Sequence, residues 1–442
     1  MVLGGIRGQN DYIIYSNPPL FYRGGFFVKM GHFGGKIPKN CCFWGMKSPK
    51  IAIFGDFVLQ SSILCDIIEV MIIKRDLEQE IRNRIGSGKT IVIYGARQVG
   101  KTTLLKTIFD DEDDVKWMNG DDEQTQVDFQ TADSKAFLPL LGNYKTIIID
   151  EAQRIENIGL KLKILHDNYG DKIQFVATGS SSFDLANKIN EPMTGRKWTF
   201  WLPAPSAKEL VETNGYENEL ANFDNRLVYG SYPAVVRDLP NARITATELA
   251  SDSLYKDVLS LGEIIKTDKL RNILKALALQ VGGQVSMTEL AGLVGIDRKT
   301  VDKYISLLEQ SFIIFRLPSY SRNLRNELKF SQKIYFYDVG IRNAIINDFR
   351  PMDSRPDAGA IFENYVISEL KKKYPLDNIY FWRNTDQQEV DFVLERDGEL
   401  TAIEIKLNKA NAKLPNAFVN AYNPKKVEII TKENCLLKLT EN

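Results

Sequence analysis

The segment that most constrains this chain is an apolar strand that runs directly into a glycine-rich loop. Residues 91–94 read Ile-Val-Ile-Tyr, and a helical pattern begins near Thr103. The loop between them consists of Gly95, Ala96, Arg97, Gln98, Val99, Gly100, Lys101 and Thr102. In this setting the pattern G-x-x-x-x-G-K-[ST] binds phosphate, because its backbone N–H groups converge on the anion and the helix N-terminus adds a positive dipole end. The sequence therefore predicts a nucleotide-binding loop over 95–103, on a parallel sheet covered by helices.

A second apolar strand supplies the acidic residues that such a loop needs. Residues 146–149 read Thr-Ile-Ile-Ile and are followed by Asp150 and Glu151. We expect Lys101 to contact the β and γ phosphates of ATP, and Thr102 and Asp150 to ligate Mg²⁺. Glu151 is then placed to orient and deprotonate an attacking water. ATP and Mg²⁺ are the predicted cofactors, and the acid pair favours hydrolysis over binding alone.

Two further residues are candidates for phosphate contact, each with an alternative. Ser180 follows the strand pattern that ends at 176–178, where a hydroxyl could sense the γ-phosphate; an ordinary turn or helix cap explains it equally well. Arg196 precedes another strand pattern and could approach the phosphates of its own or a neighbouring subunit. A structural ion pair is an equal alternative for Arg196.

These motifs resemble those of prokaryotic AAA-type ATPases, of the branch related to signal-transducing P-loop switches, that carry a nuclease-like C-terminal domain. The resemblance covers about 71–432 and is carried by residues 95–105, 149–153, 178–181, 195–196 and the Gly-Ser-Tyr-Pro turn at 230–233. It implies an α/β fold with these parts: an AAA-type P-loop core at 71–210, a helical lid at 211–265, a winged helix at 266–350 and a PD-(D/E)xK nuclease-like domain at 351–442. The strand patterns expected in the core are 90–94, 115–118, 146–150, 172–178 and 197–202.

The third of these parts has the spacing of a helix-turn-helix followed by a hairpin. Helical patterns at 270–281, 287–294 and 298–310 precede strand patterns at 312–317 and 333–337. Basic residues gather on the third helix and the hairpin: Arg298, Lys299, Lys303, Arg316, Arg322, Arg325, Lys329 and Lys333. Such a local basic surface favours contact with the DNA backbone. The alternative is a rigid packing module between the ATPase and its effector.

The C-terminal part carries two carboxylates and a lysine on strand patterns. Glu404 and Lys406 are two residues apart in one strand and project to the same side, and Asp391 on the paired strand can join them. Asp391 and Glu404 are therefore predicted metal ligands, with Lys406 positioning or activating water. Glu363, on the preceding helix, could add a further contact.

This arrangement resembles restriction-endonuclease-like D-x(n)-E-x-K nucleases, although Val390 stands where many members have proline. Two alternatives remain open. Glu404 and Lys406 could form a surface pair, or the site could be silent and retained for binding DNA or a partner. The run Lys371–Lys373 is interpreted as the solvated end of a helix.

The whole chain limits location and partners. Its 57 basic and 57 acidic residues balance, so any surface for nucleic acid must be local. No uncharged apolar stretch is long enough to span a membrane, and the four cysteines lack metal-ligand spacing, which fits the cytoplasm. Residues 1–70 differ in character and are interpreted as a poorly ordered leader or an upstream-start artefact, with a small strand-rich appendage as the alternative. A homo-oligomer is possible.

Overall fold

The computed structural model describes the backbone of residues 51–54 and 57–60, and residues 72–109, 113–130, 134–180, 192–252, 258, 266–321, 332–408 and 413–441. The chain divides into two compact units, Met1–Ile72 and Ile73–Asn442. In the first unit, β1 (Ile51–Phe54) and β2 (Phe57–Gln60) pair as an antiparallel hairpin. The rest of the predicted leader lies outside the described residues, so its interpretation stays a prediction.

The second unit begins with a five-stranded parallel sheet. Its order is β4 (Val115–Asn119), β5 (Thr146–Asp150), β6 (Gln174–Gly179), β3 (Thr90–Tyr94) and β7 (Lys197–Trp201). Every residue of β3 is buried, as expected for a parallel strand covered on both faces. The five predicted strands are confirmed, with bounds that differ by at most two residues, and the sheet is of the kind typical of P-loop cores.

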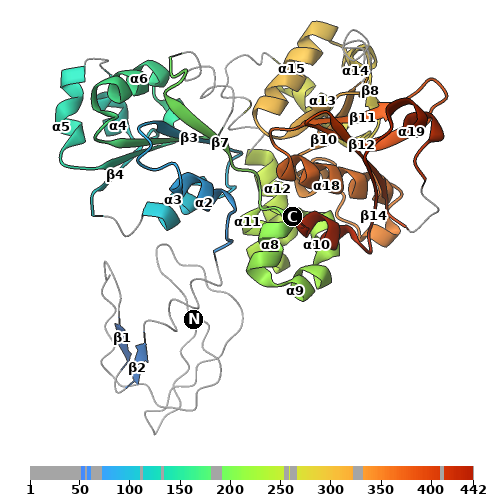
Figure 1. Cartoon of the computed structure of the whole chain (residues 1–442), viewed down its shortest axis with the longest axis horizontal. Helices are drawn as coiled ribbons and strands as arrows, with labels where there is room; N and C mark the ends of the chain where they lie inside the picture. Colours follow the sequence, from blue (N-terminus) through green and yellow to red (C-terminus); the bar gives the residue numbers. More distant parts are fainter. Residues whose placement is uncertain are drawn as a thin grey trace. The chain divides into compact units, whose positions relative to one another are not determined.

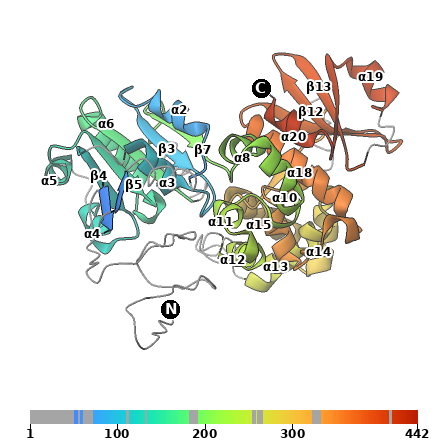
Figure 2. The ribbon, with the colours of Figure 1, turned by 90° about the horizontal axis from the view of Figure 1, so that it is seen from below.

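Helices cover both faces of this sheet (Figures 1 and 2). On one face, α2 (Leu77–Arg82) and α3 (Lys101–Phe109) pack against Ile91 and Ile93 of β3. On the other, α6 (Ile158–Tyr169) packs against Val92, together with residues of η1 (Ser134–Phe137) and α5 (Leu138–Leu141). The short α4 (Glu123–Asp128) follows β4. Because all five strands run the same way, the loops after β3, β5 and β6 meet at one edge.

Short helices, called the lid below, follow the sheet and begin at Ala207, before the bounds 211–265 predicted for the lid. They are α8 (Ala207–Asn214), α9 (Tyr216–Ala221), α10 (Phe223–Tyr229), α11 (Pro233–Arg237), η3 (Leu239–Asn241) and α12 (Ala242–Asp252). The turn at 230–233 packs tightly, because a Cβ on Gly230 would lie 2.0 Å from a carboxylate oxygen of Asp338. Asp338 is buried and accepts the backbone N–H of Ser231 at 2.8 Å. This contact joins the lid to the next part of the chain.

That next part contains the predicted three helices and hairpin. Its elements are α13 (Thr267–Leu279), β8 (Gln284–Val285), α14 (Met287–Val294), α15 (Arg298–Gln310), β9 (Ile314–Leu317), β10 (Gln332–Phe336) and α17 (Val339–Ile345). The strands form an antiparallel sheet in the order β8-β10-β9. Gly295 adopts the left-handed conformation that ends α14, and Asp297 caps α15 by accepting Thr300 N–H at 3.0 Å. The helix-turn-helix spacing is therefore confirmed.

The C-terminal part is a four-stranded mixed sheet with helices. After η6 (Met352–Ser354), its elements are α18 (Ala358–Lys373), β11 (Asn378–Arg383), β12 (Glu389–Arg396), β13 (Glu399–Lys406), α19 (Asn416–Tyr422), β14 (Lys426–Thr431) and α20 (Cys435–Thr440). The order is β11-β12-β13-β14, and only β13 and β14 are parallel. Asp397 and Gly398, both with positive φ, make the predicted hairpin turn.

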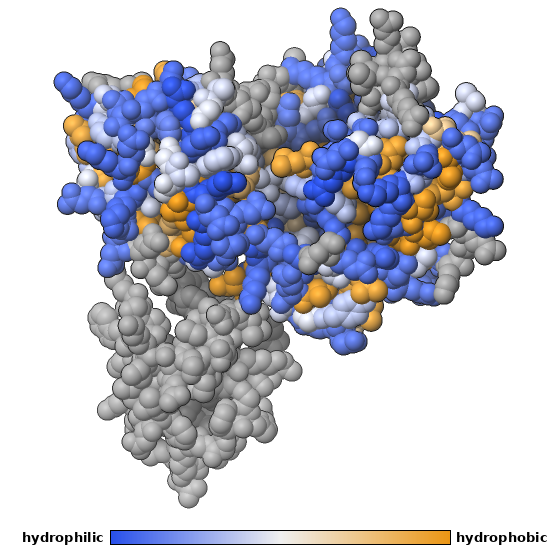
Figure 3. Space-filling view, in the orientation of Figure 1, coloured by the Kyte–Doolittle hydropathy of each residue, from blue (hydrophilic) through white to orange (hydrophobic). Residues whose placement is uncertain are grey.

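The face of the molecule in Figure 3 is mostly hydrophilic, with hydrophobic residues in separate patches. Among the described helices, none combines the length and apolar character that crossing a membrane requires. The predicted location in the cell stays a prediction.

Candidate functional site

The loop between β3 and α3 has the backbone of a phosphate cradle. Gln98 has a φ of 61° and Gly100 a φ of 100°, so the chain reverses its curvature within the loop. Gly95 has no room for a side chain, because a Cβ there would lie 2.2 Å from the carbonyl oxygen of Leu202. Gly95 also donates its N–H to Gly179 O at 3.2 Å, which ties the loop to the end of β6. The close approach of the chain after β7 and of the end of β6 thus explains why position 95 is a glycine.

Lys101 points back into this loop. It is the first residue of α3, and its Nζ donates to the carbonyl oxygens of Gly95 at 2.8 Å and Ala96 at 2.9 Å. The side chain is buried, with 5% of the residue exposed. An ammonium held at the loop by two neutral acceptors can exchange them for phosphate oxygens, which bind a cation more strongly.

Three oxygens from three different elements meet beside the loop. Thr102 Oγ1 donates to Asp150 Oδ2 at 2.7 Å, and the Thr178 hydroxyl donates to Asp150 Oδ1. Hard oxygen ligands of this kind suit Mg²⁺, which takes few protein ligands and completes its shell with phosphate oxygens and water. Thr102 and Asp150 therefore fit the predicted metal position. Sequence reasoning missed Thr178, although its place at the end of the neighbouring strand was a usable signal.

Glu151 is held in a specific orientation next to Asp150. Its backbone is left-handed, with φ 49° and ψ 39°, a conformation that non-glycine residues seldom adopt. Its N–H donates to Thr178 Oγ1 at 3.2 Å, and its carboxylate accepts from Gln153 Nε2. The same Gln153 nitrogen donates to Ser180 Oγ at 3.1 Å. Gln153, which sequence reasoning did not select as a site residue, thus connects the predicted base Glu151 with the predicted sensor Ser180.

Arg196 is not brought to the loop. Its carbonyl accepts the N–H of Thr90, the first residue of β3, so Arg196 lies at the edge of the sheet opposite the phosphate loop. Its side chain forms an ion pair with Asp167 on α6, and this bond lowers the pKa of the Asp167 carboxyl. A phosphate contact within its own subunit is therefore corrected to the structural ion pair that was its alternative. Contact with a neighbouring subunit stays a prediction.

A buried arginine connects the phosphate loop with the lid. Arg75 donates through Nη1 to Val99 O at 2.8 Å, through Nη2 to Pro203 O at 2.6 Å and through Nε to Glu209 Oε1 at 3.1 Å. Glu209 also accepts the N–H of Asp76 at 2.9 Å. The Arg75 and Glu209 side chains are 6% and 7% exposed, so this is an interior ion pair. Neither residue belongs to a recognised motif, so no sequence pattern pointed to them.

The start of α8 is also bonded to the C-terminal part. The N–H of Ala207 donates to Glu369 Oε2 at 2.7 Å, and Lys372 Nζ donates to Pro205 O at 3.2 Å. Glu369 and Lys372 form an ion pair of 2.6 Å with side chains 3% and 4% exposed. The interpretation of Lys371–Lys373 as a solvated helix end is thus wrong for Lys372. Its position on the inner side of α18 could not be read from a run of three lysines.

The predicted C-terminal residues do meet. Lys406 Nζ lies 2.6 Å from Glu404 Oε1 and 3.4 Å from Asp391 Oδ2, and Asp391 also accepts the N–H of Ile405 at 2.8 Å. Asp391 and Glu404 are buried. Burial raises the pKa of Glu404, Asp391 raises it further, and Lys406 opposes both. The surface-pair alternative does not hold for the buried Glu404.

Glu363 joins this cluster through Lys333, which was predicted to lie on the basic surface for DNA. Lys333 Nζ lies 3.1 Å from Glu363 Oε1 and also pairs with Glu389, while Tyr335 donates its hydroxyl to Glu363 Oε1 at 2.6 Å. Burial alone would lower the pKa of Lys333, but Glu363 and Glu389 outweigh it and the pKa is raised. Burial also raises the pKa of Glu363, and the charge of Asp391 adds to that effect.

The cluster does not have the form of a preformed metal centre. Glu404 Oε2 is buried without a hydrogen bond within the described part of the chain, as expected of an atom that faces a cation. Within the same residues, however, no three His, Cys, Asp or Glu side chains converge as a metal-binding group. Lys406 and Lys333 already neutralise the carboxylates. The arrangement of Asp391 and Glu404 therefore does not fit the predicted metal ion.

The predicted basic surface for DNA is smaller than expected. Lys333 is 2% exposed and lies in the cluster, and Arg316 forms ion pairs with Asp302 and Glu309. Both residues are therefore removed from that surface, because β9 and β10 turn them toward acidic partners. The three basic residues of α15, Arg298, Lys299 and Lys303, are exposed as predicted. Arg322, Arg325 and Lys329 lie outside the described residues.

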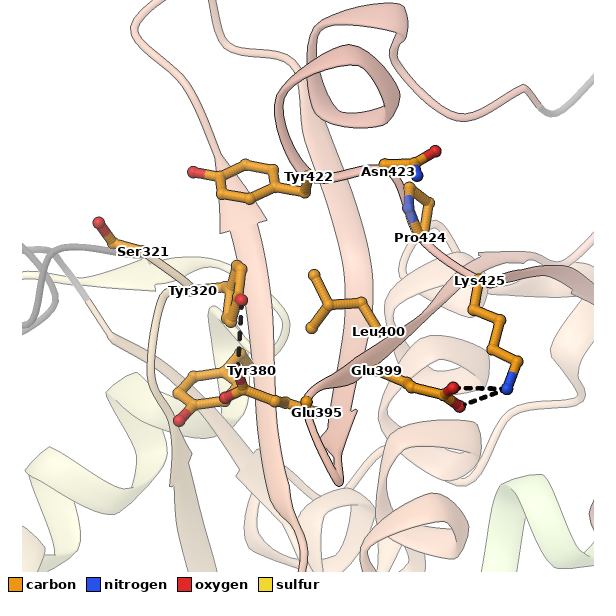
Figure 4. Close-up of a pocket in the computed structure, with 11 residues that line it drawn as sticks. Tyr320, Ser321, Tyr380, Glu395, Glu399, Leu400, Tyr422, Asn423, Pro424 and Lys425 are labelled. Atoms are coloured by element: carbon orange, nitrogen blue, oxygen red, sulfur yellow. Dashed lines mark hydrogen bonds and ion pairs between the residues drawn. The ribbon is translucent and has the colours of Figure 1, made fainter.

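A groove of about 750 Å³ lies at the other end of the β12–β13 hairpin (Figure 4). Tyr320, Tyr380 and Tyr422 line it, and their rings meet edge to face with centroids 5.2 and 5.3 Å apart. The Tyr320 hydroxyl lies 3.5 Å from Glu395, and Lys425 pairs with Glu399. The groove is formed by residues distinct from the carboxylate cluster.

The parallel sheet and the loop that follows β3 have the arrangement typical of a P-loop core. Residues 87–211 match the family model described as AAA domain, which implies nucleotide binding, typically with Mg²⁺. Residues 220–351 and 358–441 match two models described as domains of unknown function, DUF8612 and DUF4143. The first of these begins within α9 and covers the rest of the lid and the part predicted as a winged helix. A nuclease-like character of the second stays a prediction.

Two relatives described as uncharacterized proteins match most of the chain. A Mycobacterium tuberculosis protein is 26% identical over 78% of this chain and 75% of its own length. A protein of Methanocaldococcus jannaschii is 24% identical over 86% of this chain and 88% of its own. Among solved structures, the Walker-type ATPase of Pyrococcus abyssi is 14% identical and covers 62% of this chain and 96% of its own, with a TM-score of 0.44.

Proposed function

We propose that this protein binds ATP with Mg²⁺ at the β3–α3 loop and hydrolyses it. The observation that carries the proposal is the contact between Thr102 and Asp150, beside a loop whose lysine is held ready by two carbonyl oxygens. A chance occurrence of the motif would not bring a strand-end aspartate within 2.7 Å of the threonine hydroxyl. Two independent segments of the sequence thus meet where the chemistry requires them.

Each residue then has a role that follows from its position. Thr102 and Asp150 would hold Mg²⁺, which supplies charge neutralisation on the phosphates. Lys101 binds the β and γ phosphates once it leaves its carbonyl partners. Glu151, oriented by Gln153, accepts the proton of the attacking water. Ser180 contacts the same Gln153 and is placed to register whether the γ-phosphate is present.

The test uses Glu151→Gln with Glu156→Gln as a matched control, because Glu156 is exposed in the same segment. We expect Glu151→Gln to bind ATP like the wild type in calorimetry and to lose turnover by about 10²–10⁴-fold, the usual contribution of a general base. Glu156→Gln should hydrolyse normally. Normal turnover by Glu151→Gln, or no uptake of ATP by the folded wild type, would refute the proposal.

We further propose that hydrolysis changes the position of the C-terminal half. Arg75 bonds the loop carbonyl of Val99 to the lid, and the lid residue Ala207 is bonded to Glu369 on α18. A shift of the loop backbone on nucleotide binding therefore acts directly on buried ion pairs that lead to α18. Arg75→Lys keeps the charge but cannot bridge three acceptors.

Hydrogen exchange with and without ATP tests this link. In the wild type, ATP should change the exchange of amides in α8 and α18. In Arg75→Lys that change should disappear while ATP still binds, and Arg82→Lys, at a surface pair with Glu78, should behave like the wild type. An unaltered response in Arg75→Lys would show that the link does not run through this residue.

The output of the switch has two candidate forms. DNA contact rests on the exposed Arg298, Lys299 and Lys303, and DNA cleavage on Asp391 and Glu404. The lysines in the carboxylate cluster favour the other candidate, a nucleotide-switched regulator whose C-terminal site is silent. Incubation of supercoiled plasmid with protein, ATP and Mg²⁺ or Mn²⁺ separates them. Cleavage by the wild type that is lost in Asp391→Ala would support a nuclease, and no cleavage despite normal ATP turnover supports the regulator.

A further inference from the structure

Lys333 belongs to a small hairpin, but its side chain is buried among carboxylates of the C-terminal part. It is the second residue of β10, where it pairs with Leu317 of β9 and Gln284 of β8. Its side chain nevertheless leaves this small sheet and enters the C-terminal part, between Glu363 on α18 and Glu389 at the start of β12. Three elements that are distant in the sequence therefore build one enclosed position for an ammonium group.

The surroundings of the ammonium are those of a cation site. Besides its two carboxylates, it lies 5.4 Å from the ring centroid of Phe381 and 6.0 Å from that of Tyr335, and aromatic faces attract cations. Only 2% of the side chain is exposed. A lysine is almost never buried to this degree unless it is paired, and here both the charge and the apolar stem have partners.

The neighbouring carboxylates are neutralised in the same way. Lys406 contacts both Asp391 and Glu404, so the four acids of the cluster share two lysines. Arg383 adds a third basic group, 3.5 Å from Glu389. A divalent ion entering this cluster would have to displace an ammonium group or lie beside it in a poorly solvated interior, and both are unfavourable.

We propose that Lys333 is the built-in cation of the C-terminal carboxylate cluster, taking the charge-compensating place that a divalent metal ion takes in metal-dependent phosphodiesterases. The cluster then holds β10 against α18 and the C-terminal sheet without a metal ion. Because the lysine comes from β10 and the acids from α18 and the C-terminal sheet, the cluster is open to a metal only when β10 separates from α18. The role of Lys333 involves no step of ATP hydrolysis, so a failure of one proposal leaves the other intact.

Mn²⁺ binding by the nucleotide-free full chain tests the proposal, with Lys101→Ala in every protein to remove the phosphate loop as a site. Free Mn²⁺ is measured by electron paramagnetic resonance, and thermal unfolding is followed with and without Mn²⁺. Lys333→Met removes the charge and keeps the length of the side chain. Lys303→Met makes the same change on the exposed face of α15, and Lys333→Met/Asp391→Asn removes a ligand from the opened cluster.

The parent and Lys303→Met should show no Mn²⁺ uptake that depends on Asp391. Lys333→Met should bind about one Mn²⁺ per chain, at least about tenfold more tightly than the parent, and be stabilised by it. The double variant should lose both effects. Tight, Asp391-dependent binding by the parent would overturn the proposal, as would folded Lys333→Met that binds no Mn²⁺.

Lys333→Met could fail to fold without metal, since two acids lose their partner. In that case Lys333→Met/Glu389→Gln, which removes one of these charges, is used in the same two measurements. Mn²⁺ uptake by this protein supports the proposal, and its absence from the folded protein contradicts it.

Discussion

The phosphate loop was predicted from its glycine-rich pattern and the C-terminal cluster from the spacing of Asp391, Glu404 and Lys406, yet each site offers two carboxylates and a lysine near strand ends. The structure builds them differently. At the loop, Lys101 donates to the carbonyl oxygens of Gly95 and Ala96, and Asp150 accepts the hydroxyl groups of Thr102 and Thr178. In the cluster, the acids are already paired with Lys333 and Lys406. Carboxylates that are paired with buried or half-buried lysines must give up that pairing before they can bind a ligand, so the pairs of the cluster favour a role in the fold.

The largest expected effect concerns the stability contributed by the two lysines of the cluster. Lys333→Met removes one member of a buried pair and should lower the free energy of unfolding by about 3–5 kcal/mol. Lys406→Met removes a side chain that is 41% exposed, so its loss should cost less than the loss of Lys333. Urea unfolding followed by circular dichroism measures both. Equal losses would break the distinction between an internal structural cation and a surface-accessible one.

Next in size is the effect on ATP affinity. Lys101→Ala removes a charged contact with phosphate, and hydrogen bonds to charged groups contribute about 1.5–3 kcal/mol, so the dissociation constant should rise by about 10- to 150-fold. Lys406→Ala, in the other site, should leave ATP affinity unchanged. Calorimetric titration with Mg·ATP compares the two. A similar loss in Lys406→Ala would show that the cluster contributes to nucleotide binding.

A smaller effect is expected at Thr178, which holds Asp150 and the backbone of Glu151. Thr178→Val keeps the shape of the side chain and removes the hydroxyl. The hydrogen bonds that orient Asp150 and Glu151 should then contribute about 1 kcal/mol less, which corresponds to a loss of about fivefold in the rate of ATP hydrolysis. Thr107→Val, at an exposed position on α3, is the control. Turnover that equals the wild type would mean that Asp150 needs no support from β6.

The smallest effect is a pH dependence of the cluster. The pKa of Glu404 is raised by burial and by Asp391, with Glu363 adding to this and Lys406 opposing it. A carboxyl group whose pKa is higher in the folded state binds more protons there, so its contribution to stability falls as pH rises through its ordinary value near 4.5 toward the raised value. Between pH 4.5 and 7, the wild type should therefore lose more stability than Glu404→Gln, which has no titrating group at this position. Melting temperatures across this range provide the measurement, and parallel curves for the two proteins would contradict the expectation.

The sequence alone identified those parts of the protein whose residues are consecutive or lie on neighbouring strand ends. The phosphate loop is determined by eight adjacent residues, and parallel strands necessarily bring Asp150 and Glu151 to the same edge. The helix-turn-helix spacing and the hairpin around Gly398 were equally local. In each case the hydrophobic period and the turn residues specify the element, and the element specifies the position of the side chain.

Only the tertiary structure decided which charged side chains are available. Arg196 was a candidate for phosphate contact but lies at the opposite edge of the sheet, and Lys333 was counted in the basic surface but lies among carboxylates of the C-terminal part. Arg75, which joins the phosphate loop to the lid, belongs to no motif. The reason is physical: a charge is compensated by whatever the packing brings within a few ångströms, and the packing of distant segments is not encoded in the spacing of any one of them.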